Sequence, residues 1–329
     1  KNSGGSNNDN NKTYIYMAIR RPDGYVGKPP SLGTGVFAMD YGNSSEPTFD
    51  SGFPVDFALL KRPASSTGNF LAQSRLSGDN YLFTNSNQAE VSHPNFICWD
   101  SNVGWAKSWD NLRFSWMFKR HAGMDVVAYT GNSVHGTQIP HSLNKIPEML
   151  WVKQRDGTYN WMVGHKGLNG GTNPWEYSMI INSSNAEADT HWTWNDTAPT
   201  STHFTLRGDS TVNGNGYNYL GLLFASVDGI SKVGYYTGSS SDVTINLGFE
   251  PRFLIIKARN QSYSWLVIDT LRGIATSSGN NSKYLFLESN GAQGDLSVGY
   301  KTATGFVAKT GSGVVNDSSS SSYIYYAHA

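Results

Sequence analysis

An internal repeat limits the folds that this chain can adopt. An apolar segment ending in lysine occurs twice, as Pro147–Lys153 and as Pro251–Lys257, so the two lysines are 104 positions apart. A tryptophan follows eight residues after each lysine, at Trp161 and at Trp265. We therefore expect equivalent units of about 100 residues, which is the size of a β-sandwich domain.

A third and looser copy of the repeat lies earlier in the chain. Phe57–Arg62 takes the place of the lysine segment, Phe70 stands where the tryptophan was, and Phe114–Phe118 closes the copy. Tyr14–Ala18 resembles the closing strand of a further copy whose body is missing, so we expect the chain to be part of a longer protein. The predicted boundaries are 1–22 for the end of a preceding repeat, then 23–122, 123–229 and 230–329 for three repeats.

Short apolar runs bounded by Gly, Asn, Asp and Ser indicate strands along the whole chain. We predict an all-β fold of tandem β-sandwich repeats, jelly-roll-like or lectin-like. The lysine segments are apolar on both faces, so each should be a central strand whose terminal Lys emerges at the end of the sheet. The sequence leaves open whether neighbouring copies form separate sandwiches or merge into larger ones.

Charge and composition exclude several classes of protein. Lys and Arg total 25 and Asp and Glu total 25, so no basic excess points to a nucleic-acid partner. No apolar run approaches the roughly 20 residues of a membrane-spanning helix, so we expect no membrane insertion. Cys98 is the only cysteine in the sequence, which excludes disulfides within this chain. We interpret Cys98 as a small buried apolar residue.

Six segments of the chain resemble a tandem β-rich domain of virion proteins from marine tailed phages, cyanophages in particular. These segments are Tyr14–Pro22, Ser115–Gly131, Ile139–Lys153, Trp194–Thr202, Gly221–Tyr236 and Tyr323–Ala329. The resemblance implies a non-enzymatic structural protein of the virion surface, a tail fibre or appendage with a role in host attachment. It implies other virion proteins and a host-surface glycan or envelope receptor as partners, and a homotrimer as the assembly. It supplies no catalytic residues.

Two alternatives stay open, a carbohydrate-binding module of a secreted protein and a polysaccharide-degrading tailspike. A degrading enzyme needs a pair of carboxylates about 5–9 Å apart. The pairs Asp189/Asp196 and Asp50/Asp56 stand in turn-like segments, where a role in an Asx-turn is the simpler interpretation. We therefore predict no catalytic residues.

The histidines do not indicate a metal site. His135 and His141 are six positions apart, and no H-x-x-x-H or H-E-x-x-H spacing occurs in the sequence. We predict neither a metal nor another cofactor. The basic segments Arg20–Arg21 and Lys119–His121 could contact acidic lipopolysaccharide, but a solvated junction between units is the favoured interpretation.

Exposed tryptophans surrounded by Asn would suit a glycan, because sugars place their apolar faces on aromatic rings. The candidate ligand-binding residues are Trp99, Trp105 and Trp109 in the loop-like stretch 95–112, Trp175 after Pro174, and Trp192. If residues 191–194 form a strand, Trp192 and Trp194 share one face. Trp194 belongs to a repeated segment, and we expect it in the core. Specificity should lie in the loops 85–112, 169–195 and 272–283.

Overall fold

The computed structural model describes residues 31–107, 110–120 and 122–329. Over these residues the chain is all-β, as predicted, and its ladders are antiparallel. The helical segments in this part are short 3-10 turns, namely η1 (Gly33–Gly35), η2 (Arg75–Ser77), η3 (Leu168–Gly171) and η4 (Pro174–Glu176). The predicted strand Tyr14–Ala18 and the segment 1–22 lie outside the described residues.

Three six-stranded sheets share one strand order, and each belongs to one of three units within residues 31–122, 123–229 and 230–329. In the first unit the order is β1 (Phe37–Tyr41), β8 (Phe114–Phe118), β3 (Phe57–Lys61), β4 (Leu71–Ser74), β5 (Asn80–Phe83) and β6 (Val91–Ser92). In the second it is β9 (Met124–Thr130), β16 (Asn218–Phe224), β11 (Met149–Gln154), β12 (Met162–His165), β13 (Tyr177–Ile180) and β14 (Ala188–Asp189). In the third it is β17 (Ser231–Thr237), β25 (Ser322–His328), β19 (Phe253–Ala258), β20 (Leu266–Asp269), β21 (Ser282–Phe286) and β22 (Gly294–Leu296).

The repeated sequence segments explain this order. The lysine segments form β3, β11 and β19, and the aromatic closing segments form β8, β16 and β25. Each closing strand lies between the lysine strand and the first strand of its own unit. The last segment of each unit therefore completes the sheet that the first segment began.

A smaller sheet accompanies each large one. These sheets are β2 (Phe49–Asp50) with β7 (Gly104–Trp105), β10 (Thr137–Pro140) with β15 (His203–Leu206), and β18 (Val243–Asn246) with β24 (Gly305–Ala308) and β23 (Gly299–Thr302). Their apolar side chains pack on one face of the large sheet: Phe49 and Trp105, for example, share a core with Leu60. The other two units repeat this arrangement with cores of their own.

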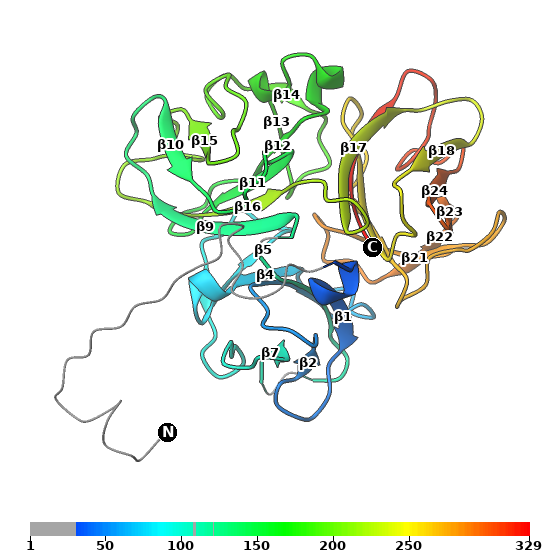
Figure 1. The fold of residues 1–329 in the computed structure, drawn as a ribbon, viewed down its shortest axis with the longest axis horizontal. Coiled ribbons are helices and arrows are strands. Elements are labelled where there is room, and N and C mark those ends of the chain that lie inside the picture. The colour runs from blue at the N-terminus through cyan, green and yellow to red at the C-terminus, as the bar shows by residue number, and fades with distance from the viewer. Residues whose placement is uncertain (1–30, 108–109, 121) are drawn as a thin grey trace.

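The opposite faces of the three large sheets meet in one shared core. Side chains alternate along a strand, so residues two apart lie on the same face. Phe57 and Leu59 of β3, Trp151 of β11, and Phe253 and Ile255 of β19 all belong to this single cluster. Figure 1 shows the three units as three lobes around this common centre. The units therefore merge through their large sheets while each keeps a separate outer core.

The lysine strands are buried at every position, which confirms their predicted central place. The prediction that their lysines emerge at the sheet end is wrong, because Lys61, Lys153 and Lys257 are all fully buried. Backbone carbonyl oxygens accept hydrogen bonds from the Nζ atom of each lysine. Lys153 Nζ, for example, donates to the carbonyl oxygen of Gly157 at 3.1 Å.

Candidate functional site

Among the predicted ligand residues that the structure describes, Trp192 is the exposed one, with 42% of its surface accessible. Residues 191–196 form turns and bends, so the strand considered above for residues 191–194 is not formed. Asn195 and Asp196 hold consecutive left-handed conformations, with φ of 54° and 49°, which reverse the chain here. Trp192 therefore faces solvent, while Trp194 lies fully buried and confirms its expected place in the core.

Polar side chains lie on and beside the turn that carries Trp192. The His191 ring lies 4.9 Å away in an edge-to-face arrangement. Arg207, directly after β15, donates from Nη1 to the His191 carbonyl oxygen at 3.3 Å and from Nε to His135 Nδ1 at 3.0 Å. We call His135, His191, Trp192 and Arg207 the Trp192 platform. It combines an open aromatic ring with hydrogen-bonding groups held in place by the ordered turn.

Trp175 is largely buried but borders two hollows. Its ring packs edge-to-face on Trp194, 6.2 Å between centroids, and 7% of its surface is exposed. A hollow of about 420 Å³ lies between Trp175, Ile146 and Lys166, and a second of about 230 Å³ lies between Trp175 and Glu176. Only a small part of the Trp175 ring is available to a ligand.

Trp99 and Trp105 do not form the predicted ligand platform. Trp105 is fully buried, and its Nε1 donates to Ser115 Oγ at 3.0 Å. Trp99 stacks on it at 5.0 Å and is 7% exposed. The physical reason is that β7 pairs with β2 and folds this apolar segment over the large sheet. Trp109, the third member of the predicted cluster, lies outside the described residues.

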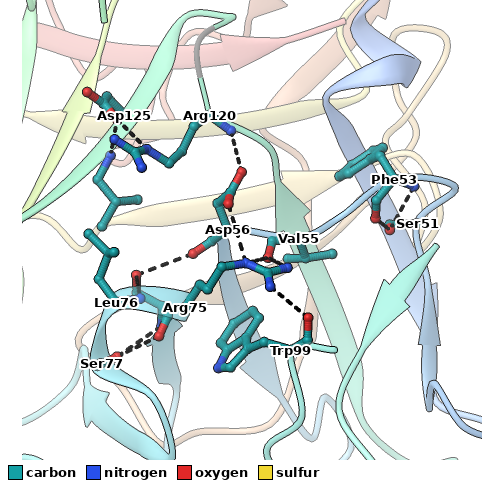
Figure 2. Close-up of polar contacts among 12 residues, drawn as sticks. Ser51, Phe53, Val55, Asp56, Arg75, Leu76, Ser77, Trp99, Arg120 and Asp125 are labelled. Carbon is teal, nitrogen blue, oxygen red and sulfur yellow. Dashed lines mark hydrogen bonds and ion pairs between the residues drawn. The ribbon is translucent and has the colours of Figure 1, made fainter. Parts of the chain in front are cut away.

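The side chain of Arg75 holds the backbone around Trp99 in place. Arg75 Nη1 donates to the Trp99 carbonyl oxygen at 2.7 Å, and its Nη2 donates to the Val55 carbonyl oxygen at 2.9 Å (Figure 2). The Trp99 indole in turn donates to the carbonyl oxygen of Gly78 at 3.0 Å. These contacts fix the loop around Trp99 and leave no open face for a ligand.

Arg120 forms part of a junction between the first and second units. Its Nε lies 2.6 Å from Asp125 Oδ1, and its backbone N–H donates to Asp56 Oδ2 at 2.9 Å (Figure 2). Asp56 Oδ1 also lies 3.5 Å from Arg75 Nε. Arg120 therefore lies at a junction between units, as expected, but its guanidinium group pairs with the buried Asp125 and is not simply solvated. Asp56 anchors its backbone.

Two buried histidines of the interior are kept neutral. Burial lowers the pKa of His165 and of His328 to about 3, so neither imidazole carries a charge near neutral pH. No three or more His, Cys, Asp or Glu side chains are grouped to hold a metal ion among the residues that the structure describes. No helix in the described ranges is long and apolar enough to span a bilayer.

A groove of about 530 Å³ lies where the first unit meets the third. Tyr41, Arg62, Asn111 and Leu112 of the first unit and Gln293 of the third line it. Sequence reasoning missed this groove, because its lining comes from segments far apart in the chain. The signal that could have revealed it is Pro63, which stands where the other two units carry an arginine.

Comparison with known proteins gives one family. A family model described as a domain of unknown function, DUF7483, matches residues 64–329. No curated protein and no solved structure matches the chain.

Proposed function

The chain belongs to the DUF7483 family, whose shared domain has no known function, and from its surface chemistry we propose that it is a non-enzymatic adhesion module. In this proposal it forms part of a phage tail fibre or surface appendage and binds a glycan on the host surface. Its other partners would be further virion proteins, and its assembly a homotrimer. The phage setting rests on the sequence resemblance alone.

The observation that carries the proposal is the exposed indole of Trp192 on an ordered turn. An open aromatic ring flanked by polar groups suits a sugar, because the C–H face of the sugar packs on the ring while its hydroxyl groups form hydrogen bonds. Arg207 and the two imidazoles of the Trp192 platform supply such groups. A single weak site of this kind becomes useful when many copies act together on one particle.

The proposal includes a finer fold assignment. We infer that each unit is a jelly-roll-like or lectin-like β-sandwich, because a smaller sheet packs over one face of each large sheet. In such a scaffold the strands stay rigid and the loops present the binding residues.

Replacing Trp192 by Ala tests the binding role. We expect at least a tenfold loss of binding to host cells or to their purified surface glycan, because the stacking surface is removed. Leu271→Ala is the matched control, since Leu271 is also an exposed apolar residue, at 48%, but lies in the third unit. Equal binding by Trp192→Ala and the unchanged chain would remove the Trp192 platform from the proposal.

The same platform would serve a carbohydrate-binding module of a secreted protein. Antibody labelling of intact phage particles separates the two settings. Label on the tail or capsid supports the virion assignment, and particles without label contradict it. Release of reducing ends from host polysaccharide would instead identify a degrading enzyme.

A further inference from the structure

Two of the three contacts between units each contain an Arg–Glu ion pair, at equivalent positions. Arg155, two residues after the buried lysine of the second unit, binds Glu90 of the first unit through two bonds of 2.7 and 3.1 Å. Arg259, at the equivalent place in the third unit, binds Glu187 of the second. In both cases the backbone N–H of the glutamate also donates to the carbonyl oxygen of the arginine.

The third contact keeps the backbone bond but has lost both charges. Gln293 of the third unit donates its backbone N–H to the Pro63 carbonyl oxygen at 2.7 Å, as Glu90 and Glu187 do to their arginines. Pro63 therefore occupies the arginine position, and Gln293 the glutamate position. Neither side chain can form the ion pair. The Gln293 Oε1 atom is shielded from solvent and has no hydrogen-bond partner among the described residues.

The groove of about 530 Å³ lies at this altered contact. Tyr41 is 41% exposed as a residue, and its ring is held by an edge-to-face contact with Phe114 at 4.8 Å. Arg62 lines the groove and has no ion-pair partner in the described part of the chain. The lining residues include no carboxylate.

A second guanidinium group, that of Arg113, lies near Arg62 but is paired with Asp110, whose Oδ2 atom is 3.9 Å from Arg113 Nε. Burial lowers the pKa of Arg113, nearby Asp110 opposes that shift, and the charge of Arg62 adds to it. Since Asp110 compensates the charge of Arg113, the guanidinium group of Arg62 supplies the positive charge that favours an anionic ligand over a cationic one. A planar guanidinium group also matches the geometry of a carboxylate.

We propose that this groove binds an acidic saccharide, a sugar of the uronic acid class, as a second site independent of Trp192. The sugar ring would pack on Tyr41 and its carboxylate would pair with Arg62. Amide groups of Asn111 and Gln293 would take its hydroxyl groups, the latter after a turn of the Gln293 amide. The choice of a saccharide rests on the proposed glycan-binding function, while the charge preference rests on the groove alone.

Restoring the lost ion pair gives a direct test. The double variant Pro63→Arg with Gln293→Glu should rebuild the contact of the other two interfaces and fill the groove. Arg62→Gln removes the charge without filling it. Both changes are made in a Trp192→Ala background, so that any remaining binding comes from the groove. Thermal unfolding of each variant shows whether it is folded.

The probes are a hexamer of galacturonic acid and a neutral galactose hexamer, with binding measured by calorimetry. We expect the acidic hexamer to bind at least tenfold more tightly than the neutral one. Both variants should weaken its binding at least tenfold, and Leu271→Ala should not. The proposal is overturned if the Trp192→Ala chain does not bind the acidic hexamer, if either folded variant binds it unchanged, or if the neutral hexamer or a hexaglutamate peptide binds equally well. Failure of the Trp192 platform appears separately, as unchanged cell binding by Trp192→Ala.

Discussion

At the scale of single residues, three equivalent lysines make stability depend on pH. Burial lowers the pKa of Lys61, Lys153 and Lys257 to about 8 from an ordinary value of 10.5. Between these values the unfolded chain holds more protons than the folded chain, so the free energy of unfolding rises with pH. Above about pH 10 the buried tyrosines oppose this rise, because burial raises the pKa of Tyr325 to about 12.

Changing all three lysines to Met should flatten this dependence. Urea unfolding at several values between pH 7.5 and 9.5 measures it. The expected result is a smaller rise in the free energy of unfolding for the variant than for the unchanged chain. Parallel curves would show that the lysines do not titrate in this range.

A buried ion pair within the third unit accepts a hydrogen bond from the first unit. Asp269 and Arg272 are both buried, with Oδ2 and Nε 2.5 Å apart, and the Trp116 indole of the first unit also donates to Asp269 at 3.1 Å. Asp269→Ala leaves Arg272 without its charge partner and should cost about 3–5 kcal/mol of stability in chemical unfolding. Asp295→Ala breaks an exposed pair with Lys283 and should cost less than about 1 kcal/mol. Similar losses would contradict the structural role of Asp269.

At the scale of elements, tryptophans directly before β12 and β20 tie neighbouring units together. Trp161 donates to the Phe83 carbonyl oxygen of the first unit at 2.8 Å, and Trp265 donates to the Ile180 carbonyl oxygen of the second at 2.9 Å. Phe70 holds the same position in the first unit and cannot donate. There Thr84 Oγ1 bonds the Leu287 carbonyl oxygen of the third unit instead, at 2.7 Å.

Trp161→Phe copies the residue that the first unit already uses. The change leaves the Phe83 carbonyl oxygen without its partner, and we expect a loss of about 1–3 kcal/mol. Trp151→Phe is the control, because Trp151 is buried but its Nε1 has no hydrogen-bond partner among the described residues. The comparison uses urea midpoints. If Trp161→Phe costs no more than Trp151→Phe, the bond between units contributes little.

The sequence predicted the elements better than the contacts between them. The lysine strands were recognisable because a short continuous apolar run indicates burial on both faces. Loops were harder: Trp99 and Trp105 stand in a segment that looks like a loop, yet the pairing of β2 with β7 buries them. The turn at Trp192 depends on the left-handed Asn195 and Asp196, a conformation that their side chains permit but do not dictate.

At the scale of the whole molecule, the shared core should make unfolding cooperative. Phe253, Ile255 and Tyr326 of the third unit pack in the same cluster as residues of the first two units. Calorimetry of the full chain should therefore show one transition whose calorimetric and van't Hoff enthalpies agree. A fragment of residues 230–329 should bind a hydrophobic dye through its uncovered face. Three separate transitions would mean that the shared core contributes little.

The shared core could not be predicted from the repeat. The repeat indicates the strands of each unit but not the face through which the unit contacts its neighbours. The residues that join the units, such as Arg155 and Glu90, carry no local pattern that separates them from solvated charges. The absence of an arginine at Pro63 is the sequence difference that marks the altered contact of the first copy.

Joining three similar units in one polypeptide also has a genetic consequence. In a ring of identical subunits, one codon change alters every interface at once, so each interface must tolerate it. Here a change at Pro63 affects only the contact with Gln293, while Arg155 with Glu90 and Arg259 with Glu187 continue to hold the other two contacts. Such a gene can change one interface under selection for a new ligand while the other two maintain the fold.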